Sequence, residues 1–153
     1  MAGYYQHYNN TIEYLFGTWE KQNPFVVGFK FINTGESRVR GTDFSIAAAT
    51  PESNKRVGLT LLAGYTYVEP VCLTPDYVYA KDSSSANGGQ LLSYRNSSMD
   101  TTGNIMKYRY KNMVKVDAEL RIKKLTLGMS YRYYSKMQNI DKAFTDIEYV
   151  TSN

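Results

Sequence analysis

The sequence predicts an all-β protein, an antiparallel meander of about five long strands with one long loop. Two-residue alternation of apolar and polar side chains recurs along the chain, whereas the 3.6-residue spacing of amphipathic helices is almost absent. The chain has 153 residues, 42% of them hydrophobic, which suits a single folded domain over residues 1–153. The chain has 15 tyrosines, which favour positions where the ring contacts an apolar surface and the hydroxyl contacts water.

The first two strands are expected over residues 4–16 and 26–50, with a break at 17–24. In the second strand, the run Asn33-Thr34-Gly35 predicts a bulge or kink. In the first strand the large apolar side chains share one face: Tyr8, Ile12, Tyr14 and Phe16.

A third strand is expected over residues 57–69, where the odd positions from Val57 to Tyr67 form the apolar face. Pro70 and Pro75 then stop strand pairing. The loop 71–104 that follows is longer than ordinary connections, so we expect it to be functional, mobile or both.

The last two strands, 105–122 and 125–137, are expected to form a hairpin around Lys123-Lys124. This turn predicts that paired residue numbers sum to 247, so that apolar side chains meet at each outward rung. The predicted pairs are Ile122 with Leu125, Leu120 with Leu127, Ala118 with Met129, Val116 with Tyr131 and Val114 with Tyr133. Because Lys-Lys is poor type I′ turn chemistry, the loop could be a residue or two longer.

The tyrosines fall late, early and late in three successive strands, which places them on one rim of an up-down-up meander. The predicted band consists of Tyr65, Tyr67, Tyr108, Tyr110, Tyr131 and Tyr133. Such a band resembles the aromatic girdle of an outer-membrane barrel, and the apolar stripe from Val114 to Ile122 is roughly 23 Å tall, near the ~25 Å of those barrels. The long loop leaves from this rim and the short turns close the other, which is the asymmetry expected of such barrels.

Alternation alone also fits a soluble β-sandwich, a binding or adhesion module with its apolar face turned inward. Dependence on detergent distinguishes the two. If the strands lie in lipid, five cannot close a barrel, since natural membrane barrels use about eight or more. An open edge in lipid would leave backbone groups unsatisfied. The membrane interpretation therefore predicts that this chain is a fragment.

Residues 28–45 resemble the descending barrel strand of TonB-dependent outer-membrane receptors. That strand commonly shows an Asn, a short polar stretch and then Arg-x-x-Gly-x-Glu. Arg38, Gly41 and Asp43 match, with Asp in place of Glu. Residues 108–144 are similar to later strands of the same family.

The resemblance implies a plugged barrel of roughly 22 strands in the outer membrane of a Gram-negative bacterium, importing a scarce nutrient of the siderophore, cobalamin or glycan class. This chain would be about a quarter of it, near its C-terminal end, without plug, TonB-contacting segment or leader. The implied partners are outer-membrane lipid, the rest of the barrel and its plug, the TonB complex through the missing N-terminal part, and a small-molecule ligand. No cofactor is implied.

A basic ladder is the candidate binding feature. Lys107, Arg109 and Lys111 alternate on the non-lipid face of one strand, and Arg132 and Lys136 lie on that face of its hairpin partner. In a complete barrel these side chains would line the lumen and attract an anionic ligand. The alternative is a solvated wall without a binding role.

Catalysis, metal binding and nucleic-acid binding are not expected from the sequence. The single histidine, His7, has no nucleophile motif beside it, so no enzyme is predicted, an outer-membrane barrel enzyme included. No Cys or His cluster could hold a metal, and Asp141 with Asp146 and Glu148 fits a solvated loop better than a calcium site. A nucleic-acid partner is not expected, because tyrosines and cations occupy opposite faces.

Overall fold

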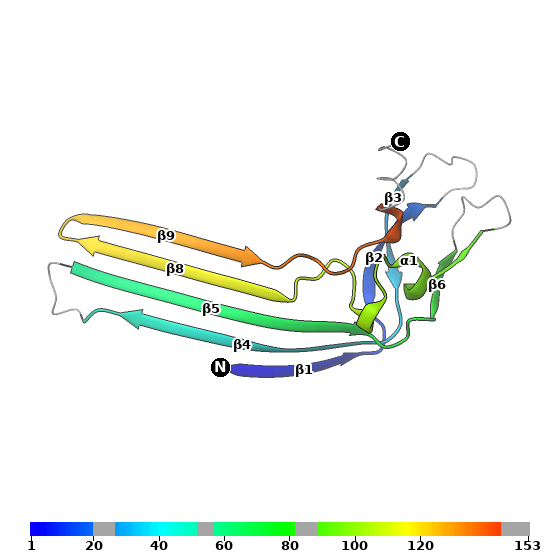
Figure 1. Cartoon of the computed structure of the whole chain (residues 1–153), viewed down its shortest axis with the longest axis horizontal. Coiled ribbons are helices and arrows are strands. Elements are labelled where there is room, and N and C mark those ends of the chain that lie inside the picture. Colours follow the sequence, from blue (N-terminus) through cyan, green and yellow to red (C-terminus); the bar gives the residue numbers. More distant parts are fainter. Residues whose placement is uncertain (20–26, 52–56, 82–88, 145–153) are drawn as a thin grey trace. The chain divides into compact units, whose positions relative to one another are not determined.

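The computed structural model describes residues 1–19, 27–51, 57–81 and 89–144, and their fold is all-β (Figure 1). The strands are β1 (Ala2–Tyr8), β2 (Ile12–Thr18), β3 (Val27–Asn33), β4 (Ser37–Ala49), β5 (Val57–Cys72), β6 (Val78–Lys81), β7 (Leu91–Ser93), β8 (Asn112–Ile122) and β9 (Leu125–Tyr134). A short helix α1 (Tyr94–Ser97) and a 3₁₀ turn η1 (Thr102–Asn104) lie between β7 and β8. No helix in the described part of the chain is long and apolar enough to cross a membrane.

The chain, expected above to form one domain, divides into two compact units. Unit 1 contains residues 1–5, 40–69 and 110–136, and unit 2 contains residues 6–39, 70–109 and 137–153.

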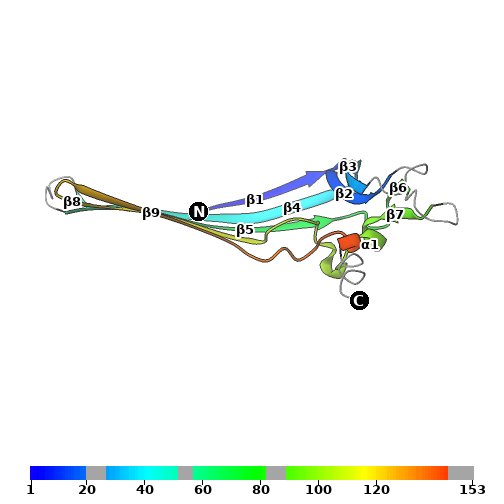
Figure 2. The same cartoon turned by 90° about the horizontal axis from the view of Figure 1, so that it is seen from above.

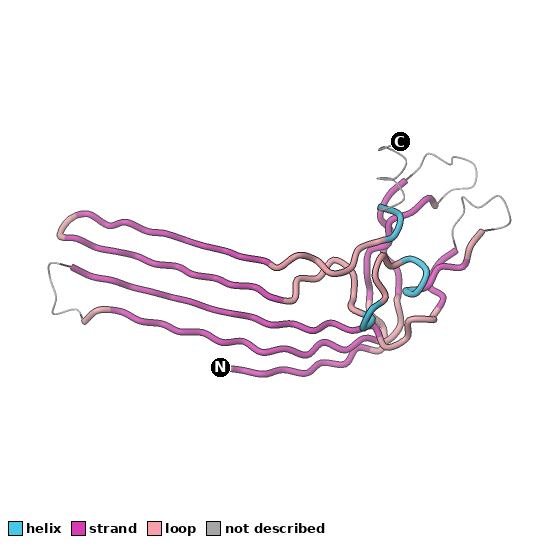
Figure 3. The backbone as a smooth tube through the Cα atoms, viewed as in Figure 1, coloured by secondary structure: helices cyan, strands magenta, loops and turns pink. Residues whose placement is uncertain are grey.

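Unit 1 is built on a five-stranded sheet in the order β1-β4-β5-β8-β9, whose strands run as long extended segments (Figure 3). The β8–β9 hairpin has the predicted register: Ile122 pairs with Leu125 and Val114 with Tyr133. The turn consists of two residues, and Lys123 closes it in the left-handed region, with φ of 55°. The predicted pairing is therefore confirmed to the residue.

The β5–β8 pairing adds a third strand, β5, whose side chains align with those of the β8–β9 hairpin. Leu59 pairs with Leu120 and Tyr65 with Val114, so the odd residues of β5 share a face with the even residues of β8. Figure 2 shows β4, β5, β8 and β9 in a single layer. Every residue of β9 is exposed, which means that neither face of this strand is covered.

Unit 2 contains two smaller sheets, one formed by β2 with β3 and one by β6 with β7. Leu15, Ile32 and Tyr94 are buried in it, together with Met106. Its interior is also polar, since Glu13, Lys107, Asn139 and Asp141 are buried as well.

Several predicted strand limits are corrected by the structure. The strand expected over 4–16 is two strands, since β1 ends at Tyr8 and Thr11, just before β2, exchanges backbone hydrogen bonds with Thr34 and Gly35. The predicted interruption at Asn33-Thr34-Gly35 is confirmed: Gly35 has φ of 83° and separates β3 from β4. The strand expected over 125–137 ends at Tyr134, and the one expected over 57–69 does not stop at Pro70 but continues to Cys72.

The strand expected over 105–122 begins only at Asn112. Tyr108 takes a left-handed φ of 56°, which ends the alternation. The backbone N–H of Met106 instead donates to Pro70, and that of Tyr108 to Asn139. The preceding segment 71–104 is not a plain loop, since it carries β6, β7, α1 and η1. Residues 82–88 of it lie outside the described residues.

Candidate functional site

The first candidate site is the apolar face of unit 1. Strand pairing places large apolar side chains side by side in rows across β5, β8 and β9, for example Leu59 with Leu120 and Leu127. On β5 and β9 many of these side chains are strongly exposed, at 45% for Leu59, 54% for Leu127 and 63% for Met129, whereas Leu120 between them on β8 is half-buried. An aligned and exposed apolar surface of this kind marks a place where another apolar medium or molecule binds.

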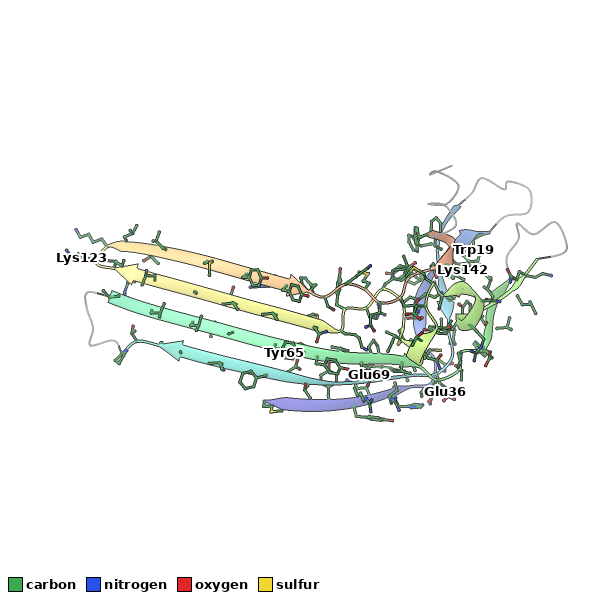
Figure 4. The ribbon with its side chains drawn as sticks, viewed as in Figure 1. Trp19, Glu36, Tyr65, Glu69, Lys123 and Lys142 are labelled. Carbon is green, nitrogen blue, oxygen red and sulfur yellow. The ribbon has the colours of Figure 1, made fainter. Side chains whose placement is uncertain are left out.

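Four tyrosines gather at one end of this face. Tyr65 and Tyr133 both pair with Val114, while Tyr67 pairs with Asn112 and Tyr131 with Val116. The phenol of Tyr65 donates to Oδ1 of Asn112 at 2.6 Å. Figure 4 shows Tyr65 well along β5 from Lys123 at the β8–β9 turn.

The two other tyrosines of the predicted band lie elsewhere. Tyr108 belongs to unit 2, where its hydroxyl donates to Asp141. Tyr110 precedes β8, and its ring packs 5.1 Å from the ring of Tyr134, which shares the face of Arg132. Both depart from the prediction because the chain before Asn112 is not a strand.

The opposite face carries paired polar side chains on β8 and β9, beside the exposed Leu62 of β5. Asp117 accepts two hydrogen bonds from Arg132, at 2.9 and 3.2 Å, and one from Ser130 at 2.5 Å. Lys115 lies 3.7 Å from the same carboxylate. The sheet of unit 1 is thus two-sided, with an unpaired apolar face and an ion-paired polar face.

The predicted basic ladder does not form one continuous row. Lys111, Arg132 and Lys136 belong to unit 1, but Arg132 is paired with Asp117. Lys107 and Arg109 belong to unit 2. Lys107 is only 3% exposed and binds Asp141, so it is a structural cation rather than part of a solvent-facing ladder.

The motif residues Arg38, Gly41 and Asp43 lie in β4. Gly41 has a clear steric role: a Cβ atom there would overlap the carbonyl oxygen of Tyr67 and lie 2.6 Å from Cζ of Tyr4. Glycine is needed because the ring of Tyr4 and the backbone of β5 both approach closely. The Nε of Arg38 is buried without a hydrogen-bond partner in the described part of the chain.

The second candidate site is a buried ionic cluster in unit 2. The Nζ of Lys107 donates to Asp141 at 2.5 Å and to Ser97 at 2.7 Å. Asp141 also accepts hydrogen bonds from the backbone N–H of Phe16 and the hydroxyl of Tyr108, both at 2.7 Å. Asp141, predicted above to lie in a solvated loop, is 1% exposed and joins three segments; its predicted neighbours Asp146 and Glu148 lie outside the described residues.

A buried carboxyl group accompanies this pair. Glu13 is 6% exposed and lies on the inward face of β2. Burial raises the pKa of Glu13 to about 7, against the opposing effects of Arg109 and Lys107, while Asp141 raises it further. Burial likewise raises the pKa of Tyr94 to about 12.

An amide network supports the cluster. The Nδ2 of Asn139 donates to the Tyr94 hydroxyl at 3.0 Å and to the carbonyl of Ile105 at 2.8 Å, and its Oδ1 accepts from the backbone of Asp100. These bonds satisfy buried polar groups that would otherwise each cost about 1–3 kcal/mol. They hold the ends of the segments that carry Lys107 and Asp141.

The structure thus reveals functional candidates that sequence reasoning missed, namely Glu13 and the Lys107–Asp141 pair. A signal existed for Glu13, since it lies in an alternating strand on the same side as Leu15. No pattern connects Lys107 with Asp141, which are 34 residues apart. The apolar residues Ile12, Tyr14 and Phe31, in contrast, lie on the outward face and are at least half exposed.

Comparison of the chain with protein-family models, curated proteins and solved structures finds no match. Among the described residues, no three His, Cys, Asp or Glu side chains gather in a way that could hold a metal ion.

Proposed function

We propose that unit 1 is a stretch of wall of an outer-membrane β-barrel, with its apolar face in contact with lipid hydrocarbon. The observation that carries this proposal is the alignment of exposed and half-buried apolar side chains on one face of three hydrogen-bonded strands. Burying one leucine side chain is worth about 1.5–3 kcal/mol. In water this face would therefore strongly favour association, whereas in lipid it is already satisfied.

The dimensions and polarity of the strands support the same proposal. The apolar rows run from Ile122 to Val114, which at ~3.3 Å per residue and a tilt of ~40° gives a height of roughly 23 Å. Tyr65, Tyr67, Tyr131 and Tyr133 would lie at the headgroup level, where phenols meet both lipid and water. The ion-paired face with Asp117 and Arg132 would face the water-filled or protein-filled interior.

Within this proposal, the complete protein is a TonB-dependent receptor that imports a scarce nutrient of the siderophore, cobalamin or glycan class. The support is the resemblance of residues 28–45 and 108–144 to strands of that family, and the steric reason found for Gly41 of the motif. Its partners would be outer-membrane lipid, the rest of the barrel and its plug, the TonB complex and the small-molecule ligand.

Spin labels along β9 test the membrane wall. In the complete protein with Cys72 replaced by Ser, each residue from 125 to 134 is changed in turn to Cys, labelled and reconstituted into liposomes. We expect labels at Leu125, Leu127 and Met129 to be accessible to oxygen dissolved in lipid, and labels at Thr126, Gly128 and Ser130 to a water-soluble nickel reagent. Equal access of the nickel reagent to both sets would contradict the membrane wall. Low access of both reagents to the first set, in a compact monomer without detergent, would instead support the soluble sandwich.

Uptake measurements test the import role separately. Cells that express the receptor are offered labelled ferric siderophore, cobalamin or oligosaccharide, with and without a functional TonB complex. We expect one of the three to accumulate only when receptor and TonB are both present. A correctly inserted receptor that accumulates none of them would argue against import and leave the membrane wall standing.

A further inference from the structure

The interior of unit 2 contains more acid than base. Among the described residues, the buried side chains that carry full charges are Lys107, Asp141 and, when ionised, Glu13. Lys107 neutralises Asp141 through a direct 2.5 Å contact. An ionised Glu13 would therefore leave one uncompensated negative charge in the interior, while a protonated Glu13 leaves none. Uncompensated buried charge is strongly unfavourable.

Glu13 lies where such a charge would act on the packing of β2. The carboxylate of Asp141 binds the backbone N–H of Phe16, three residues further along the same strand. Asp141 also binds Lys107 and Tyr108. The backbone of β2 is thus attached to segments 105–108 and 139–141 by the carboxylate that an ionised Glu13 would repel.

The charged or titratable groups that act electrostatically on Glu13 belong to unit 2. They are Lys107, Arg109, Asp141, Cys72, Tyr79 and Tyr108. Arg109 is exposed, so its opposing effect is screened by water. Tyr79 and Tyr108 are neutral phenols whose pKa burial raises further. Lys107, the buried cation among the described residues, is already engaged by Asp141.

We propose that Glu13 is a proton-controlled latch of unit 2. When protonated it keeps β2 packed against segments 105–108 and 139–141, and when ionised it loosens that contact. The latch would let unit 2 respond to the change from mildly acidic to mildly alkaline surroundings. It does not depend on the membrane role proposed for unit 1.

The direction of the response follows from proton linkage. Closed unit 2 holds the Glu13 proton up to a pH of about 7, whereas a solvated glutamate loses it near 4.5. The closed form therefore binds more protons between these values, and it is progressively disfavoured as the pH rises through this window. Between pH 6 and pH 8 the opening equilibrium of β2 should increase about tenfold.

Hydrogen exchange of the complete protein at pH 6, 7 and 8, corrected for intrinsic exchange rates, measures this equilibrium in the β2 peptide 12–18. His7, the one histidine of the chain, lies 3.6 Å from Glu36, so it is first changed to Gln in every sample. We expect protection of β2 to fall about tenfold from pH 6 to pH 8. Glu13→Gln should remove most of that fall, and Glu119→Gln, an exposed site of unit 1, should retain it.

Two results would overturn the latch. One is a change smaller than twofold in the protein that retains Glu13, which alone decides the matter even if Glu13→Gln fails to fold. The other is a folded Glu13→Gln variant that keeps the tenfold change, because another group would then be responsible.

Discussion

Replacing Gly41 with alanine should destabilise unit 1 by about 1–3 kcal/mol, the usual cost of overpacking. The new Cβ would overlap the carbonyl oxygen of Tyr67. It would also lie 2.6 Å from Cζ of Tyr4, where ordinary contact begins near 3.4 Å, so that the ring must move by about 0.8 Å (3.4 minus 2.6). The ring can turn away, but the carbonyl belongs to the backbone of β5 and moves only if strand pairing is disturbed.

Gly128 provides a matched control in the same sheet. A Cβ there meets nothing within 4 Å, and neither glycine has a positive φ, so the two sites differ in space rather than in backbone conformation. Gly128→Ala should be neutral or stabilise by up to about 1 kcal/mol, because alanine restricts the unfolded chain.

Denaturant unfolding of the complete protein in detergent micelles, followed by circular dichroism, measures both variants. The Gly41→Ala midpoint should shift to lower denaturant and the Gly128→Ala midpoint should not. Coincident midpoints for the two variants would refute the steric explanation of the motif glycine.

Three further substitutions test the buried ion pair of unit 2, the apolar rows of unit 1 and the hydrogen bond of Tyr65. Lys107→Met should destabilise unit 2 by about 3–5 kcal/mol, because Asp141 stays buried without its cation. Lys136→Met, at an exposed site, should change the stability by no more than about 0.5 kcal/mol. Equal hydrogen-exchange protection of unit 2 in the two variants would contradict this expectation. Leu127→Lys should cost about 2–4 kcal/mol in lipid bilayers and Thr126→Lys much less; similar unfolding midpoints would speak against a lipid-facing side. Tyr65→Phe should cost about 1 kcal/mol through the lost bond to Asn112, visible as a lower midpoint, and an unchanged midpoint would show that this bond is not stabilising.

The structure changes which residues of the basic ladder can be used to test attraction of an anionic ligand. Charge reversal at Lys107 would not test attraction of an anion, because it would place two carboxylates against each other in the interior of unit 2. Lys136 is exposed and offers a place where attraction of an anion can be tested. Reversal there should weaken uptake of an anionic ligand at low salt, and unchanged uptake would reject attraction by that residue.

The sequence alone determined the all-β fold and the β8–β9 register. Alternation has a period of two, so a slip of one residue would turn every apolar side chain of β9 to the other face, and a turn at Lys123-Lys124 leaves one register that aligns Leu120 with Leu127. The break at Gly35 was equally local, since glycine accepts the positive φ that the turn requires.

Only the tertiary structure decided where β8 begins, where Tyr108 lies and which charges are buried. Lys107 and Tyr108 continue the alternation of the strand that follows them, yet their partner Asp141 is 33 or 34 residues further along the chain. A side-chain pattern records preferences between neighbours in sequence. Whether a residue pairs in a β-strand or joins a buried ion pair depends instead on which distant segment of the chain packs beside it. The burial of Glu13 depends on distant segments in the same way.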